Sequence, residues 1–387
     1  MSSVDKQAEF LHLIAQSEET LLQEAIGVAT IPAPPFGEAA RSKHIAKRFR
    51  EVGLEDVTVD ELGNVVGRRR GPGPRIMVVS HMDTVFPAGT ALQPRIEGGS
   101  IYCPGIRDNS TAVANLISLV SLAGQAGWQA SCDLILASSV GEEGLGDLRG
   151  MRRLMADWGG ELDAVIAYDG DLGNVVYGGV GSERYRVTYR AAGGHSFAAF
   201  GNPSAIHGLA TACARFCQIA VPSEPKSTFN IGTIQGGTSV NAIAEEAVAL
   251  IDMRSVSQTE LDKLSAQALR IFEETASEFD CRATLEKVGD RPAGSVPVEH
   301  PLVLAAAGVL EDMGLKARLS ASSTDANIPL SLGIPAICIG SSLGHGVHTL
   351  GESMETASVV PGLQQLVRLL SRIDAAVARA PETMQPS

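Results

Sequence analysis

The chain has 387 residues, more than a single hydrophobic core usually serves, so we expect two domains. Hydrophobic residues make up 44% of the chain and charged residues 19%, which is typical of folded rather than disordered proteins. The formal net charge of -13 argues against nucleic acid or an anionic membrane surface as the main partner, because both favour a basic protein.

The N-terminal sequence MSSVDKQAEF lacks the apolar segment of a secretory signal, and no run of about eighteen apolar residues predicts a membrane span. The cysteines are scattered and form no CxxC pair, which predicts buried free thiols in a reducing, cytoplasmic setting. They are Cys103, Cys132, Cys213, Cys217, Cys281 and Cys338.

The first half of the chain alternates helical patterns with short apolar strands. The strands are almost free of polar residues, which is typical of a sheet buried on both faces. This alternation predicts an α/β fold with a mostly parallel mixed sheet flanked by helices. Helices are expected over 18–30, 38–52, 109–124 and 148–158, and strands over 75–80, 132–140 and 164–168.

The pattern changes near Gly178–Gly181, where the strand that follows alternates polar and apolar residues. The next segment has the β-α-β-β-α-β order of a ferredoxin-like domain, and the α/β pattern then returns. We therefore predict a catalytic domain of residues 1–180 and 293–387 and an inserted ferredoxin-like α+β domain of residues 181–292. The expected elements are strands over 183–191, 228–235, 247–254, 282–288 and 334–340, helices over 204–219, 259–278, 301–313 and 361–380, and a loose tail after Pro381.

Potential metal ligands follow the carboxyl ends of several predicted strands, or precede a predicted helix. In an open α/β sheet this edge is where ligands bind, so we expect these side chains to converge. Histidines with more numerous carboxylates and no cysteine indicate a co-catalytic rather than a structural zinc site. The candidates are His81, Asp108, Glu142, Glu143, Asp169 and His348.

Two neighbours complete this candidate centre. Asp83 lies two residues after His81 in an extended segment, where its carboxylate could orient the imidazole ring. The adjacent Glu142 and Glu143 point in different directions on extended backbone. One can therefore bind metal while the other acts on its bound water as a general base.

Each candidate also has a simpler interpretation. Asp108 could cap the helix that follows it, and the Glu142–Glu143 pair could lie in a solvated loop. Asp171 competes with Asp169, and His345 competes with His348, as the strand-end ligand.

Two other classes of protein compete with a metal hydrolase. Residues 340–344 read GSSLG and fit the G-x-S-x-G pattern of a serine hydrolase, although that pattern should open a helix. A non-enzymatic zinc-dependent binding protein would be favoured if Glu142 were missing, but it is present.

A series of motifs in chain order resembles the zinc aminoacylase and exopeptidase family, which includes peptidase T, the glutamate carboxypeptidases, acetylornithine deacetylase and succinyl-diaminopimelate desuccinylase. The strings GEEGLGDLRG, VGSERYRV and FGNPSAIH look closest to the peptidase T-like branch. Cys103 departs from the small residue expected before the Pro-Gly turn. The motifs are SHMDTVFP, GIRDNSTA, GEEGLGD, YDGD, GGHS, GGTSVNAIAE, DMRS, STDAN and GHGVHTLGE.

The resemblance implies two zinc ions per subunit, with cobalt or manganese able to substitute. His81 and Asp169 would bind one ion, Glu143 and His348 the other, and Asp108 would bridge both. Asp83 would be the partner of His81, and Glu142 the base that deprotonates the bridging water. The ending H-x-x-x-E, from His348 to Glu352, favours His348 over His345.

In the inserted domain, the resemblance implies that His195 stabilises the oxyanion, often across a dimer. Asn241 and Arg254 would bind the carboxylate of the substrate. We therefore expect a cytoplasmic homodimer, joined through the inserted domain, that acts as an exopeptidase on small peptides. The alternative is an N-acyl-amino-acid deacylase or another small-molecule amidohydrolase of the same family.

Overall fold

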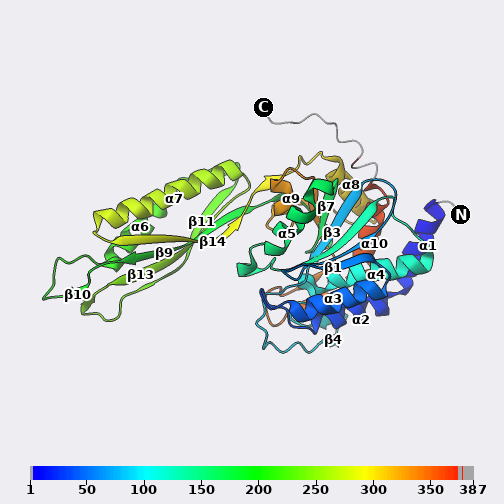
Figure 1. Ribbon diagram of the computed structural model, residues 1–387, viewed down its shortest axis with the longest axis horizontal. Helices are drawn as coiled ribbons and strands as arrows, with labels where there is room; N and C mark the ends of the chain where they lie inside the picture. The colour runs from blue at the N-terminus through cyan, green and yellow to red at the C-terminus, as the bar shows by residue number, and fades with distance from the viewer. Residues whose placement is uncertain (1–2, 374–376, 378–387) are drawn as a thin grey trace. The chain divides into compact units, whose positions relative to one another are not determined.

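The computed structural model describes residues 3–373 and residue 377. The chain divides into two compact units, whose elements are traced in Figure 1. The inserted unit is Val180–Gly294, and the main unit consists of the chain up to Gly179 and from Ser295 onward. The boundaries expected from the sequence lie within two residues of these.

The helices of the main unit agree with the predicted ones, apart from the first and a short one. The prediction missed α1, whose polar sequence still buries Phe10 and Ile14, and the short α9. The helix expected over 361–380 is present as α10, but it ends at Leu370, before a turn at Ser371 and Arg372. Residues 374–376 and 378–387, including the tail after Pro381, lie outside the described residues. The helices are α1 (Ser3–Gln16), α2 (Glu18–Ala29), α3 (Ala39–Glu51), α4 (Thr111–Ala126), α5 (Arg149–Trp158), α8 (Pro301–Asp312), α9 (Asn327–Ser331) and α10 (Val359–Leu370).

The central sheet has the strand order β1-β2-β6-β3-β7-β17-β8-β15, and β16 also pairs with β8. The neighbours β6, β3, β7 and β17 are parallel, so their carboxyl ends lie at one edge. This confirms the predicted mostly parallel sheet. The strands are β1 (Glu55–Val59), β2 (Val65–Arg69), β3 (Arg75–His81), β6 (Asp133–Ser139), β7 (Ala164–Tyr168), β8 (Asn174–Gly179), β15 (Gly294–Ser295), β16 (Arg318–Ser322) and β17 (Ala336–Ile339).

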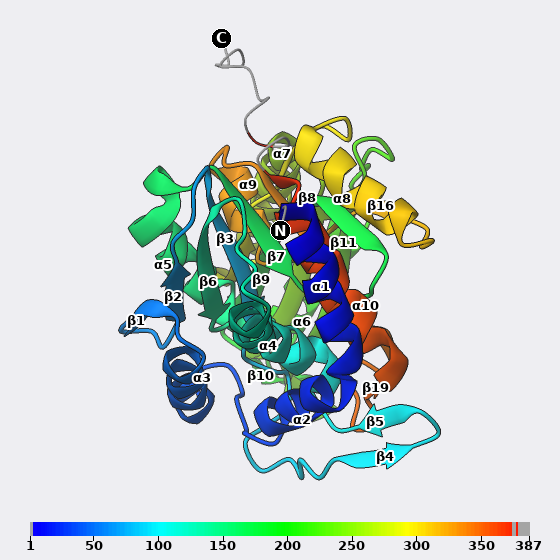
Figure 2. The same cartoon turned by 90° about the vertical axis from the view of Figure 1, so that its right-hand side faces the viewer.

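The central strands are buried on both faces, as their apolar sequences predict. In β3, Ile76 and Val78 join the core beneath α1, α2, α4 and α10, whereas Met77 and Val79 join the core beneath α5 and α9. Figure 2 shows α1, α2 and α4 together on one side of these strands. Alternate residues of a strand point to opposite faces, so helix cover on both sides requires apolar residues at every position.

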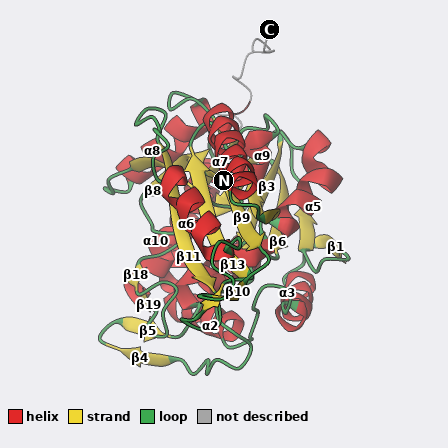
Figure 3. Ribbon diagram, turned by 90° about the vertical axis from the view of Figure 1, so that its left-hand side faces the viewer, coloured by secondary structure: helices red, strands yellow, loops and turns green. Residues whose placement is uncertain are grey.

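A small antiparallel sheet joins distant parts of the main unit in the order β18-β19-β5-β4. Ser353 of β19 pairs with Tyr102 of β5, which places the segment after His348 beside the segment that leads to Asp108. Figure 3 shows the β4–β5 hairpin at the edge of this sheet. The strands are β4 (Arg95–Glu97), β5 (Ser100–Tyr102), β18 (Gly344–His345) and β19 (Ser353–Glu355).

The inserted unit has the predicted ferredoxin-like order. Its antiparallel sheet, β11-β13-β9-β14, is covered on one face by α6 and α7 (Figure 1). In β9, Tyr185, Val187 and Tyr189 face this core, whereas Arg186 is exposed on the other face, as the alternating sequence predicts. The elements are β9 (Gly181–Arg190), β10 (Gly194–His195), α6 (Ala205–Phe216), β11 (Ser227–Gly236), β12 (Ala242–Ile243), β13 (Glu246–Ser255), α7 (Gln258–Glu278) and β14 (Arg282–Arg291).

The six cysteines are free thiols, as predicted. The expectation that all are buried is wrong for Cys217, which is exposed, and for Cys281, which is partly exposed. Within residues 3–373 and 377, no helix combines the length and the apolar character that a membrane crossing requires.

Candidate metal centre

The carboxyl ends of the parallel strands bring the predicted ligands together. His81 is the last residue of β3, Asp169 directly follows β7, and Glu142 and Glu143 lie just after β6. Asp108 comes from the irregular turn before α4, and His348 from the segment between β18 and β19.

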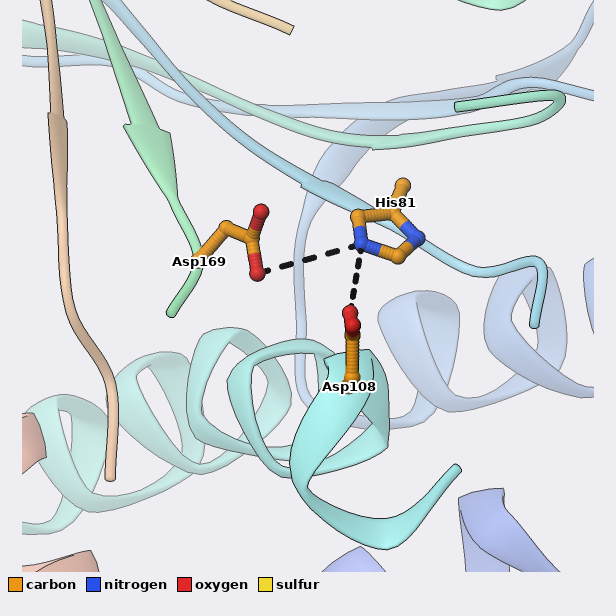
Figure 4. Close-up of side chains that lie close together, drawn as sticks. All are labelled: His81, Asp108 and Asp169. Carbon is orange, nitrogen blue, oxygen red and sulfur yellow. Dashed lines mark ion pairs between the residues drawn. The ribbon is translucent and has the colours of Figure 1, made fainter. Parts of the chain in front are cut away.

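Asp108 stands at the middle of this cluster. Its Oδ1 lies 3.1 Å from Nε2 of His81, and its Oδ2 lies 3.2 Å from Nε2 of His348. Nε2 of His81 also lies 3.9 Å from Oδ1 of Asp169, as Figure 4 shows. Nε2 of His348 lies 3.0 Å from Oε1 of Glu143.

Two groups of possible ligand residues therefore share Asp108, and within each group the ligand atoms lie within 4.8 Å of one another. One contains His81, Asp108 and Asp169, and the other Asp108, Glu143 and His348. Glu142 and Glu143 form a further group with His81. This donor set of imidazoles and carboxylates without a thiolate suits zinc in a co-catalytic site.

The cluster concentrates negative charge in a buried place. Burial, together with the nearby carboxylates of Asp108 and Glu143, raises the pKa of Asp169 to about 7. Hydrogen bonds to Asp108 and Glu143 raise the pKa of His348 to about 10. Carboxylates packed this closely require a cation, which protonated imidazoles or a metal ion can supply.

The turn after β3 sets the orientation of His81. Its Nδ1 lies 3.0 Å from the backbone oxygen of Asp83 but 3.7 Å from the carboxylate. The hydrogen-bond partner of His81 is thus the carbonyl of Asp83 rather than the side chain that we expected. An N–H at Nδ1 donating to this carbonyl leaves the lone pair of Nε2 facing Asp108 and Asp169.

The carboxylate of Asp83 has a different set of partners. Its Oδ1 accepts the N–H of Glu142 at 3.0 Å, and its Oδ2 accepts the N–H of Glu143 at 2.8 Å. Asp83 is completely buried, so these bonds compensate part of the cost of burying its charge. Asp83 therefore holds the backbone of the glutamate pair.

Two further residues hold the loops of the centre, and sequence reasoning missed both. Asn64 accepts the N–H of Val140 at 2.9 Å and donates to the carbonyl of Gly150 at 3.0 Å, which closes the loop that carries the glutamates. The buried Arg41 donates to the carbonyl of Met82 at 2.7 Å. Their local sequences contain no pattern that indicates these long-range contacts.

The geometry separates the candidates from their rivals. Asp171 accepts a hydrogen bond from Arg107 at 2.6 Å and belongs to none of the ligand groups found among the described residues. The side chain of His345 is 84% exposed and lies 3.6 Å from Glu355, outside the same groups.

The simpler interpretations of the other candidates also fail. Helix α4 begins at Thr111 with Ser110 as its N-cap, so Asp108 is not the cap. Glu142 and Glu143 are 7% and 6% exposed, which excludes a solvated loop. In the GSSLG segment, Ser341 and Ser342 are completely buried and β18 follows instead of a helix, so the serine hydrolase interpretation is wrong.

In the inserted unit, His195 and Asn241 line one cavity of about 890 Å³. Nδ1 of His195 accepts the N–H groups of Phe197 and Ala198 at 3.2 and 3.3 Å. In the neutral ring the proton therefore lies on Nε2, which can donate a hydrogen bond to a substrate oxygen.

Arg254 lies at the other end of β13 from this cavity and is not among its lining residues. At the rise of an extended strand, the six residue steps from Val248, which lines the cavity, to Arg254 span about 20 Å. The structure thus brings His195 and Asn241 together but does not bring Arg254 to them within the unit. Arg254 donates from Nε to Asp252 at 2.8 Å.

Comparisons with known proteins agree with this fold. The chain is 24% identical over 375 residues to the protein named Uncharacterized protein YqjE of Bacillus subtilis, covering 92% of this chain and 98% of that protein. The structure is similar to a tripeptidase of Staphylococcus aureus, with a TM-score of 0.82 and 24% identity over 92% of this chain and 99% of the other. It is also similar to the aminopeptidase PepT of Bacillus cereus, with a TM-score of 0.79 and 23% identity over 94% and 99% of the two chains. The structural likenesses show the fold.

The fold and the clustered ligand groups are those of a metal-dependent hydrolase that acts on peptide or amide bonds. Residues 77–372 match the peptidase family M20/M25/M40, and the chain belongs to this family. The resemblance found in the sequence motifs is thereby confirmed.

Proposed function

We propose that the protein is a co-catalytic two-zinc exopeptidase that acts on small peptides. The observation that carries the proposal is the position of Asp108, whose two carboxylate oxygens face His81 and His348 separately. One carboxylate shared by two ligand groups suits a pair of metal ions rather than a single ion. The similarity to a tripeptidase and to an aminopeptidase supports a small peptide as substrate.

His81 and Asp169 would hold one zinc ion, Glu143 and His348 the other, and Asp108 would bridge them. Cobalt or manganese could take the place of zinc, because the same ligand types bind them. His348 has a backbone φ of 64°, a left-handed conformation that is costly for a residue other than glycine. Such strain at a candidate ligand supports a functional role for this position.

A bound zinc pair would supply Lewis-acid chemistry, which lowers the pKa of water and polarises an amide carbonyl. Glu142 would accept the proton from the attacking water on its carboxylate and deliver it to the leaving nitrogen. Asp83 would keep Glu142 in place through its backbone N–H. His195 would donate from Nε2 to the developing oxyanion, and Asn241 and Arg254 would bind the substrate carboxylate.

We further propose a homodimer joined through the inserted unit. Strand β11 lies at the edge of its sheet, and Ile234 on it is 56% exposed. An exposed edge strand with apolar side chains favours pairing with a second copy. A second copy could also bring His195 and Asn241 to a substrate held by Arg254, which one copy does not do within its inserted unit. Sedimentation analysis of the purified protein tests this; a monomer at all concentrations would refute it.

The test of the catalytic proposal is Glu142→Ala. Loss of the general base should lower kcat by about 10²- to 10⁴-fold, while two zinc ions per chain remain bound. Activity and metal content are measured on the same preparation. Equal loss of both would contradict the role of Glu142 as base.

A substrate screen distinguishes the possible reactions. Di- and tripeptides are compared with acetyl-, succinyl- and carbamoyl-amino acids, each with zinc, cobalt or manganese. Preferred cleavage of small peptides supports the exopeptidase, whereas preferred cleavage of the acylated amino acids supports a deacylase with the same centre.

A further inference from the structure

The carboxylate of Glu352 is completely buried beside the segment that carries Asp108. Its Oε2 accepts the N–H of Gly105 at 2.9 Å. Its Oε1 accepts the N–H groups of Arg107 and Asp108, each at 2.9 Å. The backbone oxygen of Glu352 also accepts the N–H of Cys103 at 3.1 Å. Glu352 thus accepts most of the backbone N–H groups of residues 103–108.

The N–H groups of Gly105, Arg107 and Asp108 form what we term the amide cradle. Gly105 adopts φ 76° and ψ 11°, a left-handed conformation that lets neighbouring N–H groups face the same side. A Cβ at this position would come within 2.6 Å of Cγ2 of Thr84. Convergent backbone N–H groups of this kind favour oxygen acceptors, and the carboxyl group of Glu352 supplies these from within the chain.

The amide cradle connects the two sides of the candidate metal centre. The N–H of Asp108 is bound to Glu352, while its side-chain oxygens face His81 and His348. Glu352 and His348 belong to the same segment. The pairing of Ser353 with Tyr102 holds this segment against the amide cradle. The segment that supplies one ligand therefore also fixes the backbone of the shared ligand.

We propose that Glu352 is a positioning residue that fixes Asp108 between the two zinc ions without binding either of them. The inference rests on the proposed two-zinc function, because it assigns the shared position to Asp108. Glu352 lies outside the ligand groups found among the described residues. It acts through the amide cradle, and its loss affects the binding of two ions more than the binding of substrate.

A carboxylate is required at this position rather than any polar group. Glutamine has one acceptor oxygen, and its NH₂ group would point a donor at one of the N–H groups of the cradle. At least one buried N–H would lose its partner, and the cradle would have to move to recover it. Movement of the cradle displaces Asp108, because Asp108 is its last residue.

The test compares Glu352→Gln with Glu355→Gln, a matched control on the same segment. Glu355 has a side chain that is 42% exposed. Zinc binding is measured by titration of the metal-free protein with zinc alone, and kcat and KM with a peptide substrate. We expect Glu352→Gln to weaken binding of one zinc ion and lower kcat by about 10- to 100-fold, with KM nearly unchanged. Glu355→Gln should match the unmodified protein.

A second variant approaches the amide cradle from its other side. Gly105→Ala should distort the cradle and weaken zinc binding in the same way, and the double variant with Glu352→Gln should be little worse than either single variant. Glu352→Asp, which keeps the charge, should recover part of the zinc affinity. These variants carry the test if Glu352→Gln does not fold.

Two results would overturn the inference: two zinc ions bound by Glu352→Gln as tightly as by the unmodified protein, or fully additive effects in the double variant. A merely structural role would lower the melting temperature without changing zinc affinity, which also counts against it. Unmodified protein that keeps its activity after chelation would instead refute the proposed function.

Discussion

The two units differ in how most of their candidate site residues are held, with His348, whose side chain is 51% exposed, as the exception in the main unit. In the main unit, the side chains of His81 and Asp83 are 2% and 0% exposed, and both form hydrogen bonds with backbone groups. In the inserted unit, His195 and Asn241 are exposed, and the side chain of Arg254 is 39% exposed.

We expect this difference to separate the chemistry from the choice of substrate. A buried cluster of charges is stable only when each group has partners, so the main unit permits few changes at its centre. Groups held in one geometry can stabilise a transition state without reorganising. The inserted unit, with exposed side chains on loops and a strand end, can change without loss of its core. We therefore expect substrate preference to depend on the inserted unit and the rate of bond cleavage on the main unit.

Apart from Glu142→Ala, the largest effect should come from Asp108→Asn. Asparagine has a single acceptor oxygen and no charge, so it cannot serve both ligand groups. We expect kcat/KM to fall on the order of 10³-fold and fewer than two zinc ions to remain bound. Asp171→Asn, which removes the same charge from a residue paired with Arg107, should keep both ions. Two tightly bound ions in Asp108→Asn would refute the shared position.

A smaller loss is expected from Asp83→Asn. The amide can accept only one of the two N–H groups of Glu142 and Glu143, so the glutamate pair should shift. We expect kcat to fall by about 10- to 100-fold with a smaller change in KM, measured by steady-state kinetics. A change in KM alone would indicate that Asp83 contributes to substrate binding instead.

In the inserted unit, Arg254→Ala should act mainly on substrate binding. Loss of a charged hydrogen bond to the substrate carboxylate should raise KM by about 10- to 100-fold, with zinc content and kcat nearly unchanged. Arg186→Ala on the neighbouring strand β9 serves as the control, since Arg186 lies 3.7 Å from Glu286 in an exposed ion pair. A lower zinc content in Arg254→Ala would contradict the division of roles between the inserted unit and the main unit.

The smallest effect concerns the stability of the metal-free protein. The pKa of His348 is raised to about 10. Protonated His348 therefore stabilises the folded state fully below pH 6.5, and this stabilisation is lost as the pH rises toward 10. The pKa of Asp169, raised to about 7, acts in the same direction between about pH 4 and 7, because the folded state retains a proton that the unfolded state releases. The melting temperature should therefore fall by a few degrees between pH 6.5 and 9.

Calorimetry of the metal-free protein with and without zinc checks this prediction. Zinc competes with the same protons, so its stabilising effect should grow with pH. His348→Gln should reduce the pH dependence of the metal-free protein, whereas His345→Gln should leave it unchanged. Equal pH dependence in both variants would contradict the difference between these histidines.

The sequence predicted the convergence of the ligand candidates because apolar strands indicate a parallel sheet, and parallel strands end at one edge. It also predicted the ferredoxin-like order of the inserted unit from its alternating strands. The position of a residue after its strand could not separate Asp169 from Asp171 or His348 from His345, and the choice between them came from the family resemblance. Each pair has the same local setting, and only a distant partner, such as Arg107 for Asp171, distinguishes them.

The sequence by itself determined the fold class and the family, and it singled out Glu142 and Glu143 as candidate site residues. These follow from local periodicity and ordered motifs. Only the tertiary structure decided the partners of the buried carboxylates. Asp83 accepts the backbone N–H groups of Glu142 and Glu143, and Glu352 accepts those of the amide cradle. In both cases the carboxylate and the N–H groups are far apart in the chain. A backbone N–H is the same in every residue except proline, so no sequence pattern records which one a carboxylate accepts.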